Sequence, residues 1–177
     1  MQFNDHRQDR LRALAHYVIW RSNPADLGST KLNKVLWYSD VEAYRTLGFS
    51  VTGATSYEKR QFGPVPHNIY DALGSLQTSG KISASTENHF GMPKKMFMAI
   101  ERPDLSNFTA DQIAIVDMVA ESICKNHTAA SISQASHDAL WEEVPIGGSI
   151  PIGAAAVIVC ESTADDIAWA AQAFSQM

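Results

Sequence analysis

The stretch KLNKVLWYSD at residues 31–40, together with GPVP at residues 63–66, decides the predicted fold. Apolar side chains recur at helical spacing from Leu32 to Leu47, which is typical of a helix with one buried face. Gly48 follows, where a helix commonly ends in the left-handed conformation. The Gly-Pro corner then starts another helix, because proline tolerates the first helical turn, where its missing N–H has no partner to lose. We interpret this segment as a scaffold.

The regions on either side are predicted to be mainly helical. Periodic apolar residues predict helices near residues 11–21, 67–79, 110–125, 128–136 and 163–174. Thr30 is predicted to cap the helix that contains residues 31–40. Thr109 and Gln112 fit a capping box at the start of a longer helix.

Short strands complete the pattern. A strand is predicted within residues 51–61, and residues 81–85 and 96–100 are predicted to form a hairpin. The hairpin and residues 57–61 are expected to make one three-stranded sheet. Residues 145–153 are predicted as a Gly/Pro loop, and residues 155–160 as a strand or a buried extended run. The predicted fold class is α+β: mainly α with a small antiparallel β-sheet, a helical domain with a β-hairpin wing.

Composition excludes several classes of protein. The chain has 177 residues, 45% of them hydrophobic, which suits one domain with a real core. Its net charge of −5 argues against a protein that grips nucleic acid over its whole surface. Cys124 and Cys160 lack metal or disulfide spacing and are predicted to be buried. No apolar signal segment or membrane-spanning stretch is found, so we expect a cytoplasmic protein without membrane contact.

The chemistry-bearing residues do not form a reaction centre in the sequence. The six histidines make no metal-binding pair, so no metal or cofactor is expected. Ser136, His137 and Asp138 are adjacent and point in different directions, which does not suit a catalytic triad. We predict that His137 pins the end of a short helix and that Trp141 fills the core beside it. The protein is therefore predicted not to be an enzyme.

Polar residues within residues 31–44 have local interpretations. Asp40 and Tyr44 lie one turn apart, so a polar bond between them or across to another helix is expected. Lys31 and Lys34 are predicted to lie on a solvated face, with contact to a partner as the alternative.

These blocks, in this order, resemble the Panacea domain of SocA-like antitoxins, a family that includes phage-associated genetic-element proteins. The resemblance spans roughly residues 10–152, and residues 153–177 form a C-terminal strand/helix extension that matches no part of it. The matching residues include Thr52-Gly53, Ser133, Ser136 and Ile150-Pro151. The other matching residues are predicted to be structural or to form the Gly-Pro corner: Lys31, Leu32, Lys34, Tyr38, Asp40, Gly48, Tyr57, Gly63, Pro64, Val65, Tyr70, His137 and Trp141.

The resemblance implies an antitoxin of a toxin–antitoxin system, with a role in phage defence. Such a protein neutralises a cognate toxin, encoded by the adjacent gene, by direct protein–protein binding. The partners of the family are diverse, and one branch presents its toxin to a protease. A proteolytic adaptor is therefore one alternative function.

The rigid corner and its aromatic neighbours are the predicted partner-binding surface, because interfaces favour tyrosine, phenylalanine and arginine. The alternative interpretation is that these aromatic residues lie in the core. The predicted contact residues are Tyr57, Arg60, Phe62, Gly63, Pro64 and Val65.

A winged-helix-like DNA-binding regulator is the other alternative function. Lys94 and Lys95 would place positive charge on the wing. Residues 67–79, the candidate recognition helix, carry no lysine or arginine, which argues against reading of base edges. Nucleic acid is therefore not an expected partner. Specificity for the toxin is predicted to lie in the hairpin tip and in the extension at residues 153–177.

Overall fold

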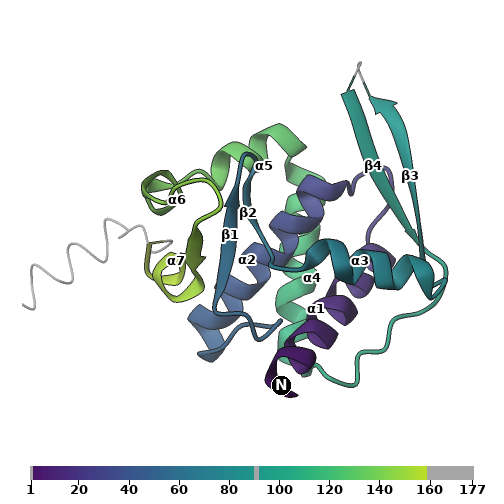
Figure 1. Cartoon of the computed structure of the whole chain (residues 1–177), viewed down its shortest axis with the longest axis horizontal. Helices are drawn as coiled ribbons and strands as arrows, with labels where there is room; N and C mark the ends of the chain where they lie inside the picture. The colour runs from purple at the N-terminus through teal and green to yellow at the C-terminus, as the bar shows by residue number, and fades with distance from the viewer. Residues whose placement is uncertain (1, 90–91, 159–177) are drawn as a thin grey trace, which may run out of the picture.

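The computed structural model describes residues 2–89 and 92–158, and Figure 1 shows their arrangement. Helices dominate and two small antiparallel sheets accompany them, which confirms the α+β prediction. The elements in chain order are α1 (Gln2–Arg21), α2 (Ser29–Leu47), β1 (Ser56–Arg60), β2 (Gly63–Val65), α3 (Ile69–Thr78), β3 (Ile82–His89), β4 (Met92–Ala99), α4 (Ala110–Asn126), α5 (Ala129–Ala135), α6 (Ala139–Glu143), β5 (Ser149–Pro151) and α7 (Ile152–Ile158).

Helix α2 lies at the centre of the molecule. It packs against α1, α4, α5, α7 and β2, so its side chains are covered on most sides. A helix surrounded in this way is expected to be apolar all round. Lys34, Ser39 and Asp40 are nevertheless among its buried residues. This is the first indication that α2 has a role beyond packing.

The ends of α2 agree only in part with the sequence. Gly48 adopts the predicted left-handed conformation, with φ of 83°, and its N–H donates to Tyr44 O at 3.0 Å. The predicted cap at Thr30 is wrong, because the helix begins at Ser29 and Gly28 is the N-cap. Gly28 lies close against the Lys94 side chain of β4, a contact that no local pattern predicts.

Strand β1 forms the middle of the larger sheet, in the order β2-β1-β5. It is antiparallel to both neighbours, and Tyr57 lies opposite Ile150 of β5. The predicted sheet of residues 57–61 with the hairpin is therefore wrong. The chain reverses directly after Arg60 to make β2, and the other edge of β1 is filled by β5, from the segment that was predicted to be a loop.

The predicted hairpin is present as a separate two-stranded sheet. Its register runs from Ile82 opposite Ala99 to His89 opposite Met92, so it is longer than the sequence indicated. The base packs against α1 and α3, and the far end projects from the body of the protein (Figure 1).

The segments around α3 and α7 correct two further expectations. Helix α3 begins at Ile69 and not at Pro66, because Asn68 takes a left-handed conformation with φ of 61°. Residues 152–158 form α7 instead of the strand expected from residue 155. Gly153 and its small neighbours let this helix pack closely on α2, and a Cβ added at Gly153 would lie 3.3 Å from Tyr44 Oη.

The remaining local predictions have mixed outcomes. Thr109 and Gln112 form the predicted capping box of α4, and α5 follows where a helix was predicted. Cys124 is half-buried, not fully buried, since it lies near the exposed end of α4. Cys160 and the helix predicted near residues 163–174 lie outside the described residues. Within the described part, no helix combines the length and the apolar character needed to cross a bilayer.

Candidate functional site

Many of the residues that carry the resemblance lie in two polar groups of side chains, one at the start of β1 and one below the turn between β1 and β2. The Asp40 cluster consists of Asp40, Thr52 and Tyr57. The Lys34 cluster consists of Lys34, Lys59, Gly63, Ser136, His137 and Trp141.

The Asp40 cluster ties α2 to the start of the sheet. Asp40 is fully buried, and its carboxylate accepts the Thr52 N–H at 2.9 Å, the Tyr57 hydroxyl at 2.9 Å and the Thr52 hydroxyl. Burial raises the pKa of Asp40 to about 6, and these hydrogen bonds oppose that shift. The carboxylate is therefore mostly ionised at neutral pH. This arrangement is the expected polar bond of Asp40, but it reaches a loop and β1 and not Tyr44.

Arg10 supports the same region from α1. Its guanidinium donates to Val51 O at 2.7 and 2.9 Å and to Gln112 Oε1 at 3.2 Å. Gln112 belongs to the capping box of α4. Arg10 thus links α1 and α4 to the loop that precedes β1, and Asp40 links α2 to the same loop. This network has the character of a structural anchor.

Lys34 is the centre of the second cluster. Its side chain is 1% exposed, and Nζ forms no hydrogen bond or ion pair within residues 2–89 and 92–158. Burial lowers the pKa of Lys34 from 10.5 to about 7. The predicted solvated face is therefore wrong for Lys34, because α5 and β2 cover this side of α2. Lys31 is half-buried, and its Nζ donates to Cys124 O at 3.2 Å.

Gly63 closes the cluster from the β2 side. Its φ of 103° lies in the left-handed region, and a Cβ at this position would collide with Lys34 Nζ and Ser136 Oγ. Ser133 donates to Phe62 O at 3.0 Å, and Ser136 donates to Ser133 O at 2.7 Å. The end of α5 therefore fixes the β1–β2 turn directly above Lys34.

His137 and Trp141 form the wall of the cluster towards α6. Their rings stack with centroids 3.6 Å apart, and Lys59 Nζ lies 3.7 Å from the indole centroid. His137 Nε2 and Trp141 Nε1 are both buried without a hydrogen-bond partner in the described structure. Burial lowers the pKa of His137, and the charges of Lys34 and Lys59 lower it further. The cluster is thus rich in donors and positive charge.

Residues 32–142, from α2 to α6, match the protein family described as antitoxin SocA-like, Panacea domain. The chain belongs to this family. The matched segment contains every residue of both clusters and supports an antitoxin role for this Panacea domain. No curated protein sequence and no solved structure matches the chain.

The predicted contact surface of this Panacea domain is only partly accessible. Tyr57 is fully buried by its bond to Asp40, and Gly63 and Pro64 are buried against α2 and α5. Val65 is half-buried. Arg60 and Phe62 are exposed, and the exposed fraction of Phe62 is 58%. The solvent-facing part of the predicted surface is therefore the tip of the β1–β2 turn.

The other residues predicted to be structural separate into two groups. Tyr70 is 71% exposed, because α3 turns Ile69, Leu73 and Leu76 to the core instead. Tyr38 is half-buried, and burial together with the charge of Asp138 raises its pKa to about 12. Leu32 and Asp40 are buried, and Gly48 needs its left-handed conformation. His137 and Trp141 are half-buried and stack on each other.

Lys59 is a member of the Lys34 cluster that sequence reasoning missed. The burial of β1 alternates, so Tyr57 and Lys59 share the inward face. That alternation is the signal that would have found it, since residues two apart on a strand point the same way.

Other features of the Panacea domain lie outside the Lys34 cluster, although Thr52 of the Asp40 cluster lines the first of two cavities. Among the described side chains, no three of His, Cys, Asp or Glu are grouped as metal ligands. One cavity of about 250 Å³ lies between the starts of α1 and α3, beside Gln8 and Asn68. A second of about 320 Å³ lies between the ends of α1 and α4. Neither is lined by a residue of the Lys34 cluster.

Proposed function

We propose that this Panacea domain neutralises a cognate toxin by direct protein–protein binding, and that the adjacent gene encodes that toxin. The observation that carries the proposal is the family match over residues 32–142. The bound antitoxin would cover the active surface of the toxin. No catalytic step by the antitoxin is needed for this mechanism.

The tip of the β1–β2 turn is the proposed centre of the contact surface. Phe62 presents an exposed aromatic ring while its carbonyl is held by Ser133 of α5. A ring on a fixed backbone loses little conformational entropy on binding, which favours affinity. Arg60 lies beside it and pairs with Glu58 at 3.0 Å. An exposed ion pair of this kind is weak, so Arg60 is free to change partner in a complex.

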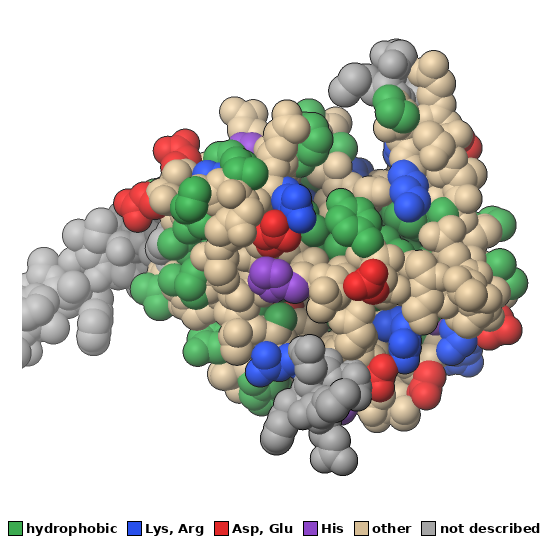
Figure 2. Space-filling view, viewed as in Figure 1, with side chains coloured by type: hydrophobic (Ala, Val, Ile, Leu, Met, Phe, Trp, Pro, Cys, Tyr) green, Lys and Arg blue, Asp and Glu red, His purple; other side chains and the backbone are tan. Residues whose placement is uncertain are grey.

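Charge gives the expected character of the toxin. The net charge of −5 would raise the association rate with a basic partner. Figure 2 shows the face that carries β1, β2 and α3, where acidic and basic side chains are mixed. The overall charge would therefore steer the toxin towards the antitoxin, and the exposed ring of Phe62 at the turn would supply affinity.

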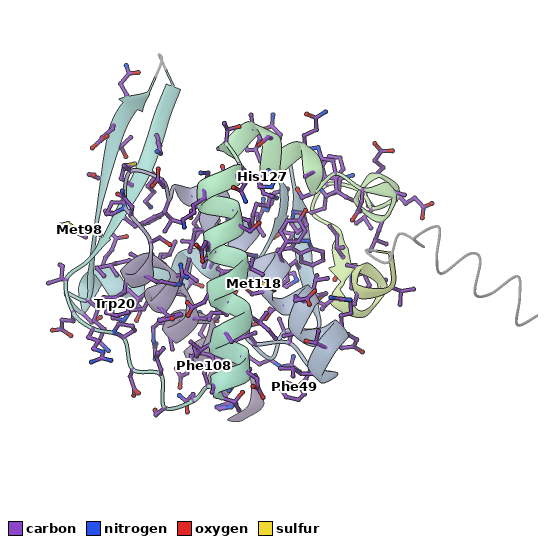
Figure 3. The ribbon with its side chains drawn as sticks, turned by 180° about the vertical axis from the view of Figure 1, so that it is seen from behind. Trp20, Phe49, Met98, Phe108, Met118 and His127 are labelled. Atoms are coloured by element: carbon purple, nitrogen blue, oxygen red, sulfur yellow. The ribbon has the colours of Figure 1, made fainter. Side chains whose placement is uncertain are left out.

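Other exposed apolar side chains of the described residues include three that lie away from this turn. Trp20, Met98 and Met118 come from α1, β4 and α4, and they are spread over the opposite side of the protein (Figure 3). The ring of Trp20 already contacts Tyr17 and Arg102.

Binding to DNA finds less support. Helix α3 carries no lysine or arginine, and Lys94 of the hairpin donates to Ala25 O at 2.6 Å. We therefore develop only the toxin complex.

Co-expression with the neighbouring gene tests the proposal. The antitoxin should restore growth and should co-purify with the toxin. Phe62→Ala should weaken the complex about thirtyfold, as expected for loss of an interface hot spot of ~2 kcal/mol. Phe49→Ala is the matched control, because Phe49 is 53% exposed and follows α2 at the other end of the protein.

Two outcomes would redirect the proposal. If Phe62→Ala and Arg60→Glu fold normally and still bind with unchanged affinity, the turn is not the contact surface. If the antitoxin shortens the half-life of the toxin, the protein is a proteolytic adaptor.

A further inference from the structure

The Lys34 cluster contains buried polar atoms without hydrogen-bond partners in the described structure. Two of the three buried side-chain atoms that lack a partner in the described chain are His137 Nε2 and Trp141 Nε1. Lys34 Nζ is not one of these three atoms, but it belongs to the same cluster and makes no hydrogen bond or ion pair within the described residues. Buried polar groups in native proteins are rarely left unpaired, so such a concentration calls for an explanation.

The two lysines of the cluster, Lys34 and Lys59, also have no ion-pair partner in the described structure. Both are buried. In place of a carboxylate, Lys59 Nζ lies 3.7 Å from the centroid of the Trp141 ring and donates to Glu142 O at 3.5 Å. Lys34 has no such contact within the described residues. The charges of Glu142 and Asp138 act on His137, but neither forms an ion pair with Lys34; Asp138 is the N-cap of α6, and its Oδ1 accepts the Trp141 N–H at 2.8 Å.

We propose that Lys34, His137 and Trp141 form a binding site for an oxyanion group, a carboxylate or a phosphate. An indole N–H and a protonated lysine can only donate, so the charged form of the site favours an anion over a cation. An anion would supply the missing acceptor and the missing negative charge together. Burial of an unpaired charge is costly, and the ligand would remove that cost.

The surroundings place the site close to the surface. Lys34 is buried, whereas His137 and Trp141 are half-buried, so the site lies one layer of side chains below solvent. Ser136 Oγ and the Gly63 backbone adjoin Lys34 Nζ. An anion would enter between the β1–β2 turn and the junction of α5 with α6.

The oxyanion can have two sources. A free phosphate or carboxylate compound would bind whether or not the protein neutralises a toxin. An acidic side chain or C-terminal carboxylate of the toxin would dock at the same site, and this second source rests on the proposed function. The position of the site beneath Phe62 makes both sources compatible with the contact surface.

Thermal unfolding with added sodium phosphate or sodium acetate tests the free-anion source, against sodium chloride at equal ionic strength. The wild type should show a saturable rise in Tm with at least one of the two anions, because a ligand of the folded state stabilises it. Lys34→Met should lose that response. Lys31→Met is the control on the same helix and should keep it.

Trp141→Phe provides an independent variant if Lys34→Met does not fold. It keeps an aromatic ring beside Lys59 and His137 and removes only the indole donor. Loss of that one charge-assisted bond should weaken anion binding about tenfold.

Affinity for the purified toxin tests the second source. Lys34→Met or Trp141→Phe should bind the toxin at least about tenfold more weakly than the wild type, with an unchanged circular dichroism spectrum. The inference is overturned if neither the response to anions nor the affinity for the toxin depends on these residues. A wild type that responds to phosphate but binds no toxin would refute the proposed function and leave the anion site standing.

Discussion

The stability of the protein should increase with pH because of one buried lysine. Burial lowers the pKa of Lys34 from 10.5 to about 7, and no partner offsets the cost of its charge in the described structure. Between these two pKa values the unfolded chain holds the proton more tightly than the folded chain. Raising the pH therefore favours folding, and the cost of the buried charge is fully present only below the folded pKa.

The size of the effect follows from the same pair of pKa values. Each pH unit inside the window is worth about 1.4 kcal/mol once the folded lysine is mostly neutral. Integration from pH 7 to pH 9 gives a gain of about 2 kcal/mol in the free energy of unfolding. Lys34→Met removes the titrating group and keeps an unbranched apolar chain, so it should abolish this gain. At neutral pH it should be at least as stable as the wild type.

Urea denaturation at several pH values measures this prediction. The difference between the wild type and Lys34→Met isolates the contribution of Lys34, because His137, Lys59 and other groups remain in both proteins. Lys31→Met should retain the pH dependence, since Lys31 already donates to Cys124 O. The reasoning is refuted if the two lysine variants respond alike to pH, or if Lys34→Met is less stable than the wild type by more than ~1 kcal/mol.

Two further predictions concern the turn and its anchor. Tyr57→Phe removes one donor to Asp40 and should cost about 1–3 kcal/mol in urea denaturation, whereas Tyr70→Phe should have no measurable effect because Tyr70 is exposed. Gly63→Ala should lower stability by more than about 2 kcal/mol, since its φ is positive and its Cβ position is occupied. Gly74→Ala is the control, with open space around its Cβ position inside α3, and should raise stability by about 0.5–1 kcal/mol. Equal stabilities of the two alanine variants would contradict the strain assigned to Gly63.

Local signals in the sequence predicted the features that depend on neighbouring residues. The left-handed Gly48, the capping box at Thr109 and the hairpin are examples, because each is determined by a few adjacent side chains. The family resemblance was also visible, since it depends on the order of short blocks along the chain.

Features that depend on distant segments could not be predicted in this way. β5 pairs with β1 across a long stretch of chain, and its three residues carry no strand pattern of their own. Lys34 was placed on a solvated face because lysine is rarely buried. Its burial results from the way α5 and β2 meet over α2, which no local pattern describes.

The pairing of β5 with β1 also determines where the protein can be shortened. The family match ends at residue 142, whereas β5 occupies Ser149–Pro151 and α7 covers α2 beyond it. A chain cut at residue 142 would leave the outer hydrogen-bonding groups of β1 open and would uncover apolar surface on α2. Open strand edges invite pairing between molecules, so such a fragment is expected to aggregate. The smallest piece that keeps the β1–β2 turn in place therefore extends through α7.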